Sequence, residues 1–294
     1  MNRFILIGIM IVGLGLSIAP AAAAPPPVKK SPPPALKNHV KGKLLADTNA
    51  IKPGVPFNVG VHLTIDEGWH IYWKNPGDSG LPTKVKFSLP EGFVAGDLRY
   101  PLPSEFDQPG DIAGFGYGKA VMLIAQITPP TTLEPAQKFA ITADVTFLVC
   151  SDVCLPGKAK VTLALPIAAD AKPANVLLFQ QWMDELPSRA ESLDNTHVSV
   201  EVAGTLQPDA WGPFSVTLRS DHPFGATQFF GGNLDALLMK DIQLDEMGKE
   251  VRVTFQARVI KGQELKISTL PILLTYELSG RKRQGMEVEI PLKP

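Results

Sequence analysis

Apolar and polar residues alternate along most of this 294-residue chain. The clearest case is the segment 56–65, in which every second residue is apolar. A period of two places such residues on one face of an extended strand. The same pattern recurs at 138–149, 158–165 and 251–259, with turn-forming glycine and proline residues between such runs. Short alternating strands separated by turns predict an antiparallel β-sandwich architecture.

One segment has a different period. Between Pro173 and Pro187, apolar residues recur at the spacing of a helix, and the two prolines mark its start and its end. Strand-like alternation resumes after this segment. We therefore predict an all-β chain with two antiparallel β-sandwich domains, at 36–170 and 190–294, joined by a short helical linker within 171–189.

The N-terminus has the pattern of a secretory signal peptide. Arg3 supplies a positive charge, an apolar run extends over 4–18, and small residues follow at 21–24. A transmembrane helix needs about 20 apolar residues, so this short run favours a cleaved signal at 1–23 over an uncleaved anchor. The proline-rich segment 24–35 is interpreted as a spacer. No later segment is long and apolar enough to cross a membrane, so we expect an exported chain that is soluble after signal cleavage.

Composition argues against several classes of function. The net charge of −1 gives no electrostatic basis for binding nucleic acid or an anionic membrane. No phosphate-binding loop, Ser–His–Asp order or pair of catalytic carboxylates stands out, which disfavours nucleotide-binding and hydrolase functions. No histidine has the spacing of a zinc ligand, so each is interpreted as structural and no metal or cofactor is predicted. The histidines are His39, His62, His70, His197 and His222.

The candidate chemistry lies in two cysteines, the only ones in the chain. Cys150 follows the predicted strand 138–149, and Cys154 precedes the predicted strand 158–165. A tight connection between strands can hold two Cα atoms within the roughly 4.4–6.8 Å that a disulfide needs. In an oxidising compartment we expect these two cysteines to bond to each other.

The length of the closed loop bears on the role of that bond. A disulfide that closes about five residues stabilises a fold by about 2 kcal/mol, against about 4.7 kcal/mol for a loop of about a hundred. So short a bridge adds little to a large sandwich, whereas a reversible couple needs two sulfurs close together on an exposed turn. The loop holds no Lys, Arg or His, and Asp152 disfavours a thiolate. We therefore interpret the pair as a shuttle whose disulfide is attacked by a partner's thiolate.

Three segments resemble one known family. VTFLVCSDVCLPGKAKVTLALP (145–166) resembles the cysteine region of the periplasmic N-terminal domain of DsbD-type thiol:disulfide interchange proteins. Its three-residue cysteine spacing is closer to the ScsB variety, which is linked with copper tolerance. GWHIYWKNPGDSGLPTKV (68–85) resembles the GWHxYWxxPGDxGLP signature of the family, and DIAGFGYGKAVMLIAQI (111–127) resembles its cap-loop region and the strand after it.

The resemblance implies an immunoglobulin-like fold for both β-sandwich domains and a redox-active pair at Cys150 and Cys154. It implies an aromatic cap over the sulfurs from Phe115 or Tyr117, which we expect in an exposed, glycine-rich loop. Relatives of this type act in the periplasm with thioredoxin-like proteins, in processes that include cytochrome c biogenesis. They continue into a transmembrane conduit and a thioredoxin-like domain that this sequence does not show, so a separate membrane thiol reductase is expected as the electron source.

Two interpretations stay open at this point. The chain is a thiol:disulfide exchange protein, or it is a non-enzymatic binding module whose disulfide is structural. In the second case copper handling or assembly is the expected role, since the soft sulfurs of Cys150, Cys154 and Met122 suit Cu(I). The reduction potential separates the two, because structural disulfides lie below about −300 mV.

Overall fold

The computed structural model describes residues 38–108, 112–133, 138–189, 198–207, 210–231 and 236–292. The signal peptide expected at 1–23 and the spacer expected at 24–35 lie outside the described residues and remain predictions. From residue 38 onward the chain forms one compact unit. None of the described helices has the length and hydropathy that would let it span a membrane.

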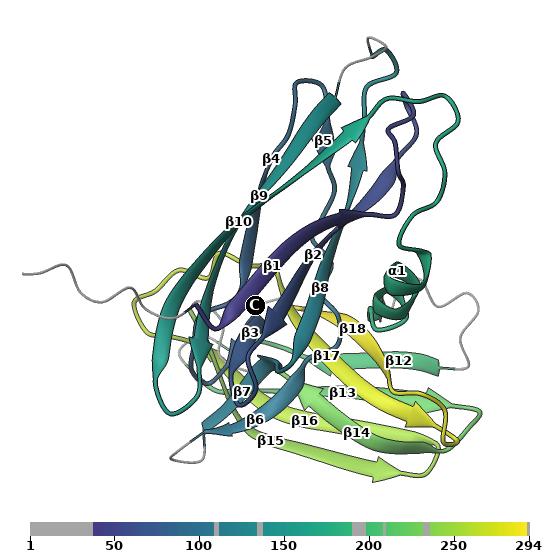
Figure 1. Ribbon diagram of the computed structural model, residues 1–294. Helices are drawn as coiled ribbons and strands as arrows, with labels where there is room; N and C mark the ends of the chain where they lie inside the picture. The colour runs from purple at the N-terminus through teal and green to yellow at the C-terminus, as the bar shows by residue number, and fades with distance from the viewer. Residues whose placement is uncertain are drawn as a thin grey trace, which may run out of the picture. The chain divides into compact units, whose positions relative to one another are not determined.

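Two antiparallel sheets, here called the first sheet pair, occupy the part of the chain that holds the cysteines (Figure 1). One sheet has the order β1-β2-β8-β5, and the other has the order β10-β9-β3-β7-β6, with β4 also paired to β9. The strands of the first sheet are β1 (Val40–Ala46), β2 (Phe57–Ile65), β8 (Ala120–Thr128) and β5 (Val94–Ala95). Those of the second are β10 (Cys154–Pro166), β9 (Lys138–Cys150), β3 (His70–Gly77), β7 (Ile112–Tyr117), β6 (Ser104–Gln108) and β4 (Lys84–Ser88).

Two further sheets, the second sheet pair, follow in the sequence. Their strand orders are β11-β18-β17-β14 and β12-β13-β16-β15. The strands of one are β11 (Ser188–Arg189), β18 (Gln284–Pro291), β17 (Thr269–Leu278) and β14 (Phe224–Phe230). Those of the other are β12 (Val198–Gly204), β13 (Gly212–Ser220), β16 (Glu250–Val259) and β15 (Leu237–Met247). The all-β, immunoglobulin-like class expected from the sequence is confirmed, whereas the two domain boundaries remain a prediction.

The alternating residues form the buried cores. In β2, every second side chain from Phe57 to Ile65 is at most 6% exposed, as the period of two predicts. Each sheet pair has its own cluster of buried apolar side chains. Phe230 and Leu273 of the second sheet pair belong to the cluster of the first, and both are fully buried. The two cores therefore meet through these side chains.

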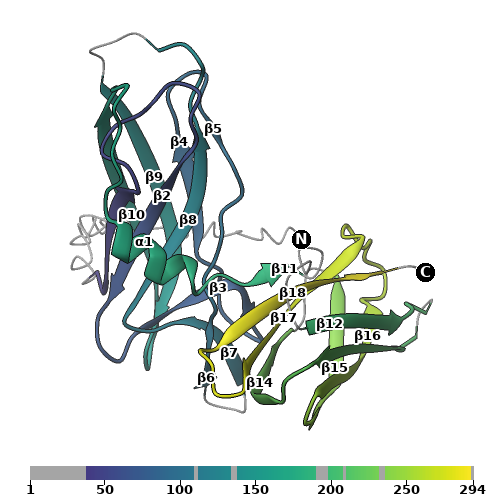
Figure 2. The same cartoon turned by 90° about the vertical axis from the view of Figure 1, so that its right-hand side faces the viewer.

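The helix α1 (Val176–Met183) lies within the range expected for the linker. Its Phe179 is 2% exposed and packs with Met122 and Ile124 of β8, on the face of that sheet opposite to the main core. Figure 2 shows the helix beside this sheet. Burial of one such aromatic side chain stabilises a fold by about 1.5–3 kcal/mol, so the helix is fixed by packing.

Candidate functional site

Cys150 and Cys154 form a disulfide, as expected. Cys150 is the last residue of β9 and Cys154 is the first of β10, and the two are direct cross-strand partners. Their Cα atoms lie 4.2 Å apart, slightly closer than the usual range. The residues between them close the turn with a hydrogen bond from Ser151 N to Val153 O of 3.0 Å. The bond thus sits at the end of a long hairpin, next to the connecting loop.

The two sulfur-bearing residues differ in exposure. Cys150 is 1% exposed, whereas Cys154 is exposed to solvent. The loop between them is also exposed, and the apolar side chain of Val153 is 58% exposed. An incoming thiolate can therefore approach Cys154, while the protein covers Cys150.

Two aromatic residues of β3 lie on the same face as Cys150. His70 is the direct cross-strand partner of Cys150, and directly opposed residues share one face of a sheet. Tyr72 follows two positions later and returns to that face. Its hydroxyl donates a hydrogen bond to Cys150 Sγ at 3.4 Å, and its side chain is 1% exposed. The buried sulfur thus has a hydrogen-bond donor beside it.

A turn in the chain holds the ring of Tyr72 in place. A Cβ atom at Gly80 would lie 2.4 Å from Cε1 of this ring, and Gly80 has a φ of 108°. Only glycine readily combines this backbone conformation with so close an approach. The amide of Thr83 donates to the carbonyl oxygen of Tyr72 at 3.2 Å. The segment 78–83 therefore packs on the tyrosine that contacts Cys150.

His70 connects Tyr72 to a third ring. Its imidazole stacks on Phe106 of β6 with ring centroids 4.5 Å apart, and it meets Tyr72 edge-on at 5.4 Å. Burial lowers the pKa of His70 below its ordinary value of 6.5, which favours the neutral imidazole at neutral pH. Its buried Nε2 has no hydrogen-bond partner within the described residues. We call His70, Tyr72 and Phe106 together the aromatic shield.

The glycines of β7 make room for this arrangement. Gly116 is the cross-strand partner of Tyr72, and Gly114 is the partner of Phe106, so both glycines lie on the face of the shield. A Cβ at Gly116 would come within 2.0 Å of Ile71 O. With no side chain at either glycine position, Phe106 of β6 reaches across the strand to His70.

Phe115 and Tyr117, the expected cap residues, lie on the other face of the same strand. Each is 5% exposed and belongs to the buried core of the first sheet pair. The hydroxyl of Tyr117 donates to Pro101 O at 2.8 Å, and burial raises the pKa of Tyr117 well above its ordinary value. The expectation of an exposed loop was therefore wrong, because the alternation of β7 turns glycines toward the sulfurs and aromatic rings toward the core.

Sequence reasoning missed the residues that do surround Cys150. The alternation within 68–73 could have placed His70 and Tyr72 on one face of a strand. No local signal marks Phe106, because its position depends on the pairing of β6, β7 and β3. The pairing of β7 with β3 joins segments that are distant in sequence.

In the described part of the chain, the disulfide is not accompanied by a cluster of metal ligands. Among the described residues, no group of three His, Cys, Asp or Glu side chains could hold a metal ion. Met122 lies in β8 of the other sheet, with its side chain packed beside Gly60 and Phe179. The soft-ligand set with Cys150 and Cys154 is therefore not assembled.

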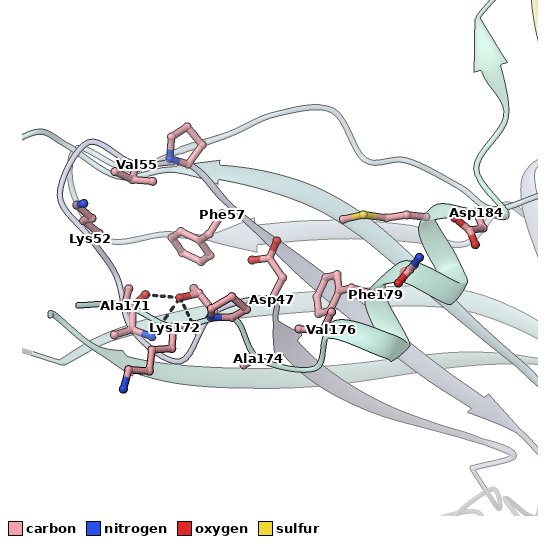
Figure 3. Close-up of a pocket in the computed structure, with 16 residues that line it drawn as sticks. Asp47, Lys52, Val55, Phe57, Ala171, Lys172, Ala174, Val176, Phe179 and Asp184 are labelled. Carbon is pink, nitrogen blue, oxygen red and sulfur yellow. Dashed lines mark hydrogen bonds between the residues drawn. The ribbon is translucent and has the colours of Figure 1, made fainter. Parts of the chain in front are cut away.

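A groove beside α1 is separate from this chemistry. Its volume is about 550 Å³, and apolar side chains such as Phe57, Val176 and Phe179 line it (Figure 3). The carboxylate of Asp47 at its wall accepts hydrogen bonds from the main chain and side chain of Asn58. Neither cysteine lines this groove, so the disulfide remains the candidate site.

Comparison with known proteins finds a family that matches the part of the chain holding the disulfide. Residues 41–166 match the sequence model of the family described as thiol:disulfide interchange protein DsbD, N-terminal. This range includes both cysteines and the whole aromatic shield. No curated protein matches the chain.

One solved structure is similar over most of the chain. It is the N-terminal periplasmic domain of ScsB from Proteus mirabilis, with a TM-score of 0.59 and 16% sequence identity, over 87% of this chain and 94% of that one. This similarity supports the fold. A protein of unknown function from Porphyromonas gingivalis W83 aligns at a TM-score of only 0.23 with 10% identity, over 86% of this chain and 100% of that one.

Proposed function

We propose, given that residues 41–166 form a domain of the DsbD N-terminal type, that the chain is a thiol:disulfide exchange protein of the periplasm. It passes reducing equivalents to oxidised partner proteins through Cys150 and Cys154. The observation that carries this proposal is the asymmetry of the disulfide. Cys154 is exposed, whereas Cys150 is 1% exposed and accepts a hydrogen bond from Tyr72.

The asymmetry assigns different roles to the two sulfurs. A thiolate of a reduced donor protein attacks Cys154 Sγ and forms a mixed disulfide with it. The Cys150–Cys154 bond breaks, and Cys150 Sγ leaves with the bonding electron pair. The donor's second thiolate then attacks its own sulfur in the mixed disulfide and releases Cys154 as a thiolate. Two electrons pass to the chain, each cysteine takes up one proton from water, and the reverse sequence reduces an oxidised partner.

Tyr72 stabilises the charge that forms on Cys150. A hydrogen bond donated to an anion favours the charged form, and such bonds contribute more than those between neutral groups. The Tyr72 hydroxyl is already within hydrogen-bonding distance of Cys150 Sγ in the disulfide form. Little rearrangement is therefore needed when the disulfide bond breaks. The neutral His70 adds no positive charge to this face of the sheet.

A structural role fits the position of the bond less well. Cys150 and Cys154 already face each other across a ladder that runs the whole length of β9 and β10. The two cysteines are only four positions apart in sequence. Removing a disulfide that closes so small a loop lowers the unfolding free energy by only about 2 kcal/mol. The partners proposed are thioredoxin-like periplasmic proteins on the oxidised side and a membrane thiol reductase as the electron source.

The test is to trap the mixed disulfide with an oxidised, purified thioredoxin-fold protein. The thioredoxin-fold protein carries serine in place of its second active-site cysteine, and its first is activated as a mixed disulfide with thionitrobenzoate. Cys150→Ser leaves the exposed Cys154 free to displace thionitrobenzoate, and the resulting mixed disulfide should persist because neither protein retains a resolving sulfur. Cys154→Ser leaves only the buried Cys150 and should trap far less. The proposal fails if neither variant captures the thioredoxin-fold protein, or if the wild-type disulfide has a reduction potential well below about −300 mV, where structural bridges lie.

A further inference from the structure

The second sheet pair contacts the chain just before β6. Arg283, which precedes β18, donates a hydrogen bond from Nη2 to the carbonyl oxygen of Pro103 at 2.9 Å. The neighbouring Leu102 is 8% exposed and lies against Gly285 of β18, where a Cβ atom would come within 2.2 Å of Leu102 Cδ2. Contacts with the second sheet pair therefore fix the residues just before β6.

The same part of the second sheet pair contacts the strand beside β6. Phe230 of β14 is fully buried and meets Phe115 of β7 edge-on, with ring centroids 5.0 Å apart. Its ring centroid also lies 6.3 Å from that of Trp73 of β3. The guanidinium carbon of Arg283 is 5.5 Å from the centroid of Phe230, so the two anchoring side chains stack on each other. Arg283 is fixed in turn by Gln228 Oε1 and Thr275 Oγ1, each at 3.1 Å.

These anchors lie close to the aromatic shield along the chain. Phe106 follows Pro103 by three residues, which span about 10 Å in a strand. It stacks on His70, the cross-strand partner of Cys150. Since the shield face of β7 carries glycines, Phe106 is placed by the position of the β6–β7 hairpin as a whole. Displacement of that hairpin would move Phe106 away from His70.

We propose that Arg283 and Phe230 are positioning residues that hold the β6–β7 hairpin closed, so that the aromatic shield covers Cys150 and directs attack to Cys154. This inference rests on the proposed exchange function and assigns a role in it to the second sheet pair. Neither residue contacts the reacting sulfurs. Both act through Phe106, which keeps a partner away from Cys150 and leaves Cys154 open to attack.

The experiment measures the alkylation rate of each cysteine separately in the reduced full-length protein. N-ethylmaleimide is added in limiting amount, and the tryptic peptide 139–158, which contains both cysteines, is fragmented to assign the labelled site. In the wild type we expect Cys150 to react about ten-fold more slowly than Cys154, as expected of a covered thiol. Arg283→Ala and Phe230→Ala should each raise the Cys150 rate several-fold and leave the Cys154 rate nearly unchanged.

Three matched variants define the interpretation. Phe106→Ala removes the shield directly and should raise the Cys150 rate at least as much. Arg283→Lys can still donate to Pro103 O but lacks the planar guanidinium, so it should restore part of the protection. Arg219→Ala removes an exposed arginine of β13 that pairs with glutamates of its own sheet, and it should change neither rate.

The inference is overturned if the wild type labels both cysteines equally. It is also overturned if Phe106→Ala exposes Cys150 while folded Arg283→Ala protein does not. If circular dichroism shows that Phe230→Ala does not fold, the Cys150 labelling rate of Arg283→Ala alone tests the inference. Labelling needs no partner protein, so its outcome does not depend on the trapping experiment. A failure to trap a mixed disulfide would refute the exchange function, whereas the labelling rates alone decide whether Arg283 and Phe230 protect Cys150.

Discussion

The hydrogen bond from Tyr72 to Cys150 predicts a specific kinetic defect. Tyr72→Phe removes the hydroxyl that lies 3.4 Å from Cys150 Sγ and keeps the ring that packs on Gly80. A hydrogen bond to a charged group contributes about 1.5–3 kcal/mol. If the lower value is lost from the departing thiolate, the attack step slows by about ten-fold, since about 1.4 kcal/mol is a factor of ten in rate.

The assay follows reduction of the disulfide by dithiothreitol, with samples quenched in acid and the free thiols counted by mass spectrometry. Tyr276→Phe is the matched control, because Tyr276 is a buried tyrosine of the second sheet pair that packs edge-on against Phe224. Tyr72→Phe should be slower than the wild type, and Tyr276→Phe should match it. Equal rates for all three proteins would refute the view that Tyr72 stabilises the leaving sulfur.

Three further predictions concern stability. The Cys150→Ser, Cys154→Ser double variant should lose only about 2 kcal/mol of unfolding free energy in urea, and a chain that no longer folds would favour a structural bridge. Phe115→Ala should cost about 3–5 kcal/mol because it empties a buried site, and an unchanged melting temperature would contradict its place in the core. Because burial lowers the pKa of His70 and His62 below 6.5 in the folded state, the unfolded state binds more protons below that pH, so stability should fall on acidification. His70→Gln should reduce the difference in urea midpoint between pH 7.5 and pH 5.5, and an unchanged difference would exclude His70 as a source.

The fold was accessible from sequence because its signals are local. Alternation within 56–65 reports one buried face of a single strand, and β2 has that face. The prolines at 173 and 187 enclose the helical period, and α1 lies between them. The cysteine pair was found in the same way, because three intervening residues allow little besides a tight hairpin turn.

The surroundings of the disulfide could be predicted from the sequence only in part. Alternation alone could have separated the glycines from the aromatic rings in GFGYG, provided that this segment was interpreted as a strand. Its glycines suggested a loop instead. The contact of Phe106 with His70 depends on the register of three strands, which the turns and bulges between them determine. The contact of Arg283 with Pro103 joins residues 180 positions apart, and no local pattern could indicate it.

The position of the two cysteines at the end of one hairpin has a consequence for turnover. The ladder between β9 and β10 pairs the two residues directly, and it should keep them opposite each other when the disulfide is reduced. The oxidised and reduced forms should therefore present nearly the same surface to other proteins. Under the proposed exchange function, a donor would then not be released by a change of shape after it delivers its electrons. Rapid cycling then requires that every complex be weak and short-lived, with the direction of transfer determined by the relative potentials and concentrations of the partners.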